Sequence, residues 1–221
     1  RMNTMSLFES VESDGSVSLS DLFSGKEITN GKSDLELRDV AEIIIRGGWP
    51  ESIEKESDIS YEMIESYCTS LEKKDMSAVD GIHRDSSKVN AIMRSLSRNI
   101  STSVSKSTIL EDLNESGNSM NINTLDSYLS ALRKLYVLDE LRSWSPQMRS
   151  KTAIRKTPVI EFADPAIAAY YLGASADDLL DDPETFGFLF ESLVIRDLRV
   201  YAETLHGNVY RYHDRNDLEA D

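Results

Sequence analysis

The chain has 221 residues, of which 40% are hydrophobic and 29% charged, and its formal net charge is -15. This composition is ordinary for a globular protein with a sizeable core, and the acidity argues against general affinity for nucleic acid or membrane surfaces. No apolar run approaches the roughly 18 residues of a membrane span, and the first residues lack the apolar core of a signal peptide. The single cysteine, Cys68, cannot form an intrachain disulfide, so we expect a cytoplasmic protein without a membrane partner.

Helical periodicity dominates the first hundred residues after a Ser-, Asp- and Gly-rich start over residues 1–32. Ser33 and Glu36 form a candidate capping box for a helix that ends near Arg46. Apolar stripes over residues 61–71 and 89–104 predict two further helices.

A Gly47-Gly48-Trp49-Pro50 sequence follows the first of these helices. Two glycines supply backbone freedom, the tryptophan supplies a large apolar anchor, and the proline prevents the helix from resuming. The simplest interpretation is a helix-terminating turn filled by an aromatic side chain.

Residues 121–163 have the layout of a winged helix. An apolar stripe from Leu125 to Leu135 predicts a helix with Asn123 as its N-cap. Residues 136–141 and 157–163 then predict two short strands, separated by a polar, basic loop.

Positive charge is concentrated in this region. Residues 133–156 contain seven basic and two acidic residues, a local charge of about +5 in an acidic chain. Lys and Arg displace counterions from phosphates, so the island favours a polyanion partner, most simply DNA. The alternatives are a merely solvated wing or a protein-binding winged helix. The predicted nucleic-acid contacts are Arg149, Lys151, Arg155 and Lys156.

The last third is again helical. Asp164-Pro165 begins a short helix that Gly173 ends, and Asp182-Pro183 begins a long helix to about His206. Apolar residues from Phe186 to Leu205 predict a broad buried face for the long helix. The fold class is therefore mainly α with a small β component.

No phosphate-binding loop, dinucleotide fingerprint or nucleophile elbow is present in the sequence. Two acids are candidates for a divalent-metal site: Glu191 in the long helix and Asp221 at the end of a predicted strand. The alternative is that Glu191 forms a structural ion pair with Arg196 or Arg199.

Taken in order, several segments resemble the C-terminal part of prokaryotic AAA-type ATPases, which carry a P-loop domain, a helical lid, a winged helix and a nuclease-like end. The resemblance covers nearly the whole chain. The segments that carry the resemblance are Met5-Ser-Leu-Phe-Glu-Ser, Arg46-Gly-Gly-Trp-Pro-Glu, Arg98-Asn-Ile-Ser-Thr, Ser145-Pro146, Arg149-Ser-Lys-Thr, Phe162-Ala-Asp-Pro, Phe186-Gly-Phe-Leu-Phe-Glu-Ser-Leu and Leu218-Glu-Ala-Asp.

The resemblance implies four parts. Residues 1–32 would be the tail end of the ATPase core, 33–85 a helical lid, 86–164 the winged helix-turn-helix, and 165–221 the truncated start of an α/β, PD-(D/E)XK nuclease-like domain. It implies Glu191 and Asp221 as the first two nuclease acids.

The parent would use ATP and Mg, held by Walker motifs before the first residue. We expect the fragment itself to hold no cofactor and to be catalytically inactive, because the Walker motifs and the E-x-K motif are missing. Its expected partners are DNA and the parent's own ATPase domain, with homo-oligomer formation left open. The leading hypothesis is a DNA-binding effector part controlled by that ATPase domain. The alternatives are a metal-dependent nuclease in the intact parent or a protein-interaction scaffold.

Overall fold

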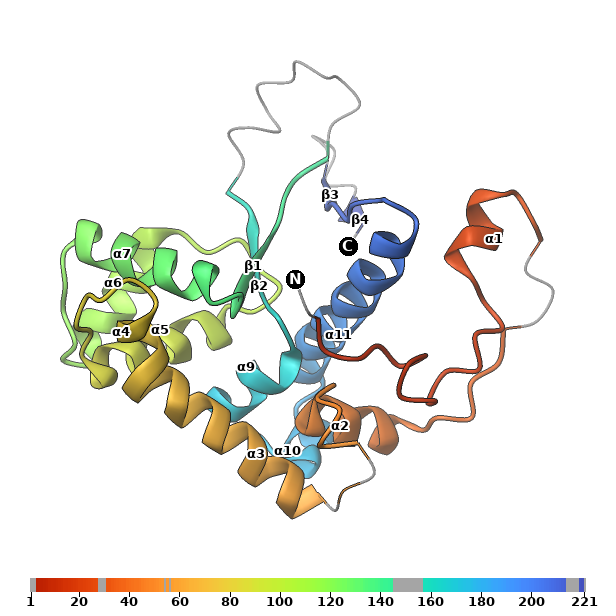
Figure 1. Cartoon of the computed structure of the whole chain (residues 1–221), viewed down its shortest axis with the longest axis horizontal. Coiled ribbons are helices and arrows are strands. Elements are labelled where there is room, and N and C mark those ends of the chain that lie inside the picture. The colour runs from red at the N-terminus through yellow and green to blue at the C-terminus, as the bar shows by residue number, and fades with distance from the viewer. Residues whose placement is uncertain are drawn as a thin grey trace.

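The computed structural model describes residues 3–27, 31–53, 55, 57–144, 157–213 and 219–220. It is mainly helical with two small antiparallel strand pairs, which confirms the predicted fold class. Helices α4 to α7 gather at one end of the molecule, the arm that carries α1 lies at the other, and the long helix α11 lies between them (Figure 1).

The N-terminal third contains α1 (Leu19–Phe23) and α2 (Leu37–Arg46). The predicted capping box at Ser33 was wrong: α2 begins at Leu37, and Glu36 and Asp39 cap it reciprocally. Gly47 ends α2 with φ of +71°, a conformation that glycine adopts without steric conflict.

The next helix, α3 (Ser57–Ser70), continues into a π-helical turn (η1, Leu71–Asp75) and then into α4 (Met76–Ala78). Its buried side chains include Ile64 and Cys68, as the apolar stripe predicted.

Three helices and a strand pair follow: α5 (Ser86–Arg98), α6 (Lys106–Glu115), α7 (Ile122–Lys134), β1 (Leu138–Leu141) and β2 (Val159–Phe162). Asn121, not the predicted Asn123, caps α7 by accepting from the Thr124 N–H at 2.9 Å. The predicted helix over 89–104 is also too long, because α5 ends at Arg98 and Ser101 adopts a positive φ of 56°. The strands pair antiparallel, with Leu138 opposite Phe162 and Leu141 opposite Val159.

The last third contains α9 (Pro165–Leu172), α10 (Ala176–Asp181), α11 (Pro183–Thr204), β3 (Tyr212–His213) and β4 (Glu219–Ala220). Asp164 and Asp182 cap α9 and α11 as predicted, and Gly173 ends α9 in the left-handed conformation. The prediction of one broad buried face on α11 was wrong in part. Leu189 and Leu193 are buried, whereas Phe190 is 47% and Leu205 39% exposed.

A continuous apolar core connects these parts. It runs from Ala41 in α2 to Leu193 in α11 and includes the inner faces of α3, α5, α7 and α9. A smaller cluster of Leu141, Val159 and Ile195 packs β1 and β2 on α11. None of the helices that the structure describes combines the length and apolar character that crossing a bilayer requires.

Candidate functional site

The helices and strands over residues 86–162 follow the helix–helix–helix–hairpin order of a winged helix. In a helix-turn-helix the second helix of the pair reads the major groove, and α7 holds that position after α6. Its exposed side chains include Asn123, Ser130 and Lys134, which carry hydrogen-bonding groups. The face is polar rather than strongly basic, because Asp126 is also on α7 and pairs with Lys106 at 2.6 Å.

The four cations predicted to contact phosphates lie outside the described residues, since Arg149, Lys151, Arg155 and Lys156 fall within 145–156. Arg142, the described cation nearest to them in sequence, is exposed just after β1.

The first two cations of the basic island are partly neutralised by acids. Arg133 bonds Glu140 at 2.8 Å, and Lys134 lies 4.0 Å from Asp80. The contact with Asp80 could not be predicted from the local charge, because Asp80 lies more than 50 residues before Lys134 in the sequence.

A cleft of about 610 Å³ separates β1 from the C-terminal end of α11. Charged side chains of its lining form ion pairs. Arg199 of α11 lies 3.2 Å from Asp139 of β1, and Arg133 lies beside Glu140. The remaining lining is Asn3, Tyr136, Leu138, Arg142, Ala202, Glu203, Gly207, Asn208, Val209 and Tyr210.

Of the two acids predicted to bind a metal, Asp221 lies outside the described residues, and Glu191 is half-buried on α11. Among the described residues, His, Cys, Asp and Glu side chains form no group of three that could hold a metal ion. Arg196, one suggested ion-pair partner of Glu191, instead binds Asp164 and Asp197.

A second glutamate near Glu191 was missed. Glu161 of β2 is 1% exposed, and neither carboxylate oxygen has a hydrogen-bond partner in the described part of the chain. Burial raises the pKa of Glu161 to about 7, and Glu191 contributes to the increase, while Ser192 and Arg199 oppose it. The alternation of side chains along a strand predicts that Glu161 lies on the same face as Val159. It does not predict which groups surround the carboxylate.

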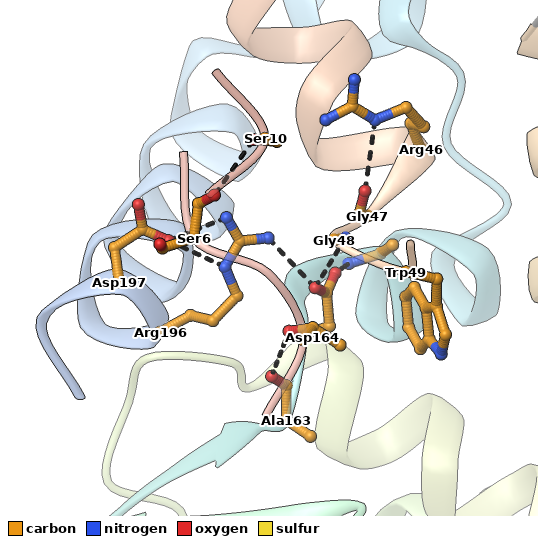
Figure 2. Close-up of polar contacts among 12 residues, drawn as sticks. Ser6, Ser10, Arg46, Gly47, Gly48, Trp49, Ala163, Asp164, Arg196 and Asp197 are labelled. Atoms are coloured by element: carbon orange, nitrogen blue, oxygen red, sulfur yellow. Dashed lines mark hydrogen bonds and ion pairs between the residues drawn. The ribbon is translucent and has the colours of Figure 1, made fainter. Parts of the chain in front are cut away.

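A densely bonded polar group is the buried junction of four segments distant in sequence, shown in Figure 2. Asp164 accepts from the Gly48 N–H and from Arg196 Nη1, both at 3.0 Å. The Arg196 guanidinium also donates to Asp197 Oδ1 from Nε at 2.9 Å and Nη2 at 2.8 Å. Burial alone would lower the pKa of Arg196, but the two carboxylates outweigh burial and raise it.

The fourth segment of the junction is the strap, residues 3–7. The Met5 N–H donates to the Gly48 carbonyl at 2.7 Å, and the Leu7 N–H donates to Asp197 Oδ2 at 2.9 Å. A β-carbon on Gly48 would overlap the Met5 carbonyl oxygen. The Gly-Gly sequence therefore does more than end a helix: it lets the strap pass directly over the turn.

The cysteine has the role expected of a small apolar side chain. Cys68 is completely buried, and burial raises the pKa of its thiol to about 12. It is therefore protonated at neutral pH, a state in which a thiol is a poor nucleophile.

Residues 37–178 match the model of a family described as a domain of unknown function (DUF8612), so the chain belongs to that family. The match begins at α2, spans the helices and strands of the winged-helix order, and ends within α10. No curated protein matches the chain, and no solved structure does.

Proposed function

We propose that this chain binds DNA through its winged helix and serves as the effector part of a larger AAA-type ATP-binding protein. The observation that carries the proposal is the position of the basic island. The wing loop that joins β1 to β2 contains the cations of residues 142–156 and no acid.

The arrangement supports phosphate contact next to a helix that could enter the major groove. In such a complex α7 would present Asn123 and Ser130 to base edges, while the wing cations neutralise the adjacent backbone. Ion pairs reduce what Arg133 and Lys134 can contribute, so most of the electrostatic affinity would come from the wing.

Fluorescence anisotropy with a labelled duplex, measured over a range of salt concentrations, tests the proposal. We expect weak binding that falls steeply with salt, because each neutralised phosphate releases counterions. Replacing Arg149, Lys151, Arg155 and Lys156 by Ala should weaken binding to all sequences and lower the slope of log K against log salt by about 3 to 4.

The matched control removes the same number of positive charges from exposed sites elsewhere: Lys26, Lys32, Lys73 and Lys74. This control should change the slope far less than the wing variant. Equal effects of the two variants would mean that only net charge matters, and the winged-helix proposal would fail.

The proposed parent couples ATP binding to DNA engagement, with ATP and Mg bound outside this chain. Because the chain lacks the Walker lysine that contacts the phosphates, calorimetry with Mg-ATP should detect no binding. Micromolar affinity would contradict the assignment of the nucleotide site to another domain.

A further inference from the structure

Three large aromatic side chains that flank β1 and precede β3 are exposed: Tyr136 (58%), Trp144 (49%) and Tyr210 (48%). We call them the aromatic strip. Tyr136 lies in the turn between α7 and β1, Trp144 follows β1, and Tyr210 precedes β3. The strands meet here, because the Trp144 N–H donates to the Arg211 carbonyl at 2.7 Å, and the Trp144 ring lies 5.9 Å from Tyr212.

Tyr136 is held in an unfavourable backbone conformation. Its φ is +58°, in the left-handed region, which costs a bulky residue about 1–2 kcal/mol. A glycine or asparagine would fit this turn with less strain. The ring itself is largely exposed, so its face is accessible to a ligand.

Tyr136 and Tyr210 both line the cleft of about 610 Å³ between β1 and α11, and Arg142 lines it too. The cleft acids are engaged within the protein: Asp139 by Arg199, Glu140 by Arg133, and Glu203 by the Asn3 amide at 2.9 Å. A ligand would therefore meet aromatic faces and the exposed Arg142 more readily than bare carboxylates.

We infer that the aromatic strip and Arg142 bind the unpaired bases of single-stranded nucleic acid. Tyr and Trp rings provide stacking surfaces for bases of any sequence, and an arginine beside them can bind a phosphate or stack. This inference rests on the proposed function, and it extends that function from duplex DNA to a strand emerging next to the wing.

Exposed tyrosine, tryptophan and arginine are also typical of protein interfaces. Two features favour nucleic acid. Trp144 immediately precedes residues 145–156, whose sequence contains four cations and no acid, and Arg142 adds a further positive charge at the cleft. A protein partner would need its own run of acids to match these cations, whereas a nucleic acid carries a phosphate at every nucleotide.

The test measures binding of a short fluorescein-labelled oligothymidylate and of a duplex of equal length to the full chain. Tyr136→Asn, Trp144→Leu and Tyr210→Leu should each weaken oligothymidylate binding about tenfold while changing duplex affinity less than twofold. Tyr136→Phe and Tyr210→Phe should retain binding, because they keep the stacking ring. Tyr61→Leu, at an exposed tyrosine on α3, is the matched control and should have no effect.

Thermal unfolding provides a second readout. Tyr136→Asn should lower affinity with a Tm close to that of the unmodified chain, because asparagine tolerates the positive φ and the substitution removes the stacking ring. A purely structural tyrosine would show the opposite, a lower Tm with unchanged affinity, and that result would overturn the inference.

The outcomes separate the two proposals. If the wing variant loses duplex binding but the aromatic variants keep full oligothymidylate affinity, the inference fails and the proposed function stands. If no nucleic acid binds but the aromatic variants alter self-association in light scattering, the strip is a protein contact and both proposals fail.

Discussion

Two buried polar sites lie three residues apart in the chain and illustrate opposite solutions to burying charge. Asp164 is 0% exposed and accepts from the Gly48 and Ala166 N–H groups and from Arg196. Glu161 is 1% exposed and has no hydrogen-bond partner for either oxygen among the described residues.

The difference shows that burial alone does not decide how many hydrogen bonds a carboxylate receives. At the junction, donors converge from several segments and tie these segments together. At Glu161 the charged form is poorly stabilised, and protonation is the less costly alternative. The contact between β2 and α11 should therefore depend on pH.

The largest expected effect comes from removing the cation of the junction. Arg196→Leu leaves Asp164 and Asp197 buried without their shared partner, and breaking a buried pair in this way costs about 3–5 kcal/mol. Urea unfolding measures the loss. Arg199→Leu serves as the control, because the Arg199–Asp139 pair is partly exposed at 19% and 25%, and it should cost about 1 kcal/mol or less. Similar losses in both variants would mean that the junction does not contribute more than an ordinary ion pair.

Glu161 should make the free energy of unfolding depend on pH. Its pKa rises from 4.5 in the unfolded chain to about 7 in the folded chain, so the native state binds the extra proton. Stability from this group is fully present below pH 4.5, falls as pH rises towards 7, and is constant above that, with a total loss of about 2–4 kcal/mol.

Glu161→Gln should remove that decline. The slope of the free energy of unfolding between pH 5 and 8 is the quantity to compare, because the buried amide has its own unsatisfied groups and changes the absolute stability. Glu62→Gln, at an exposed glutamate of α3, should leave the slope unchanged. An unaltered slope in Glu161→Gln would show that Glu161 is ionised throughout this range.

The smallest effects concern the backbone of the junction. Gly48→Ala should destabilise the chain by about 1–3 kcal/mol, because the new methyl group overlaps the strap at the Met5 carbonyl. Gly187→Ala should have the opposite sign and stabilise by up to about 1 kcal/mol, since it lies within α11 with nothing within 4 Å of its added β-carbon. Chemical denaturation of both variants tests the difference. A neutral Gly48→Ala would indicate that the strap moves aside easily.

Sequence reasoning succeeded where a local signal was sufficient. The Asp-Pro pairs at 164–165 and 182–183 mark the starts of α9 and α11, and the apolar stripe of α7 is buried as predicted.

Sequence reasoning failed where several local solutions compete. Asn121 and Asn123 are both good N-caps, and only the packing of α7 selects the first. Phe190 is exposed because α11 has apolar residues on more than one face, and periodicity does not say which face meets the core.

The sequence by itself determined the helical character of the chain, the order of helices and strands over residues 86–162, and the basic island between β1 and β2. These features depend on spacing and charge within a few tens of residues. The tertiary structure alone decided that Gly48, Asp164, Arg196 and the strap form one junction, and that the Glu161 carboxylate is buried without a hydrogen-bond partner among the described residues. The physical reason is that both outcomes depend on which donors reach a carboxylate from segments distant in sequence, as Gly48 does for Asp164 across 116 residues.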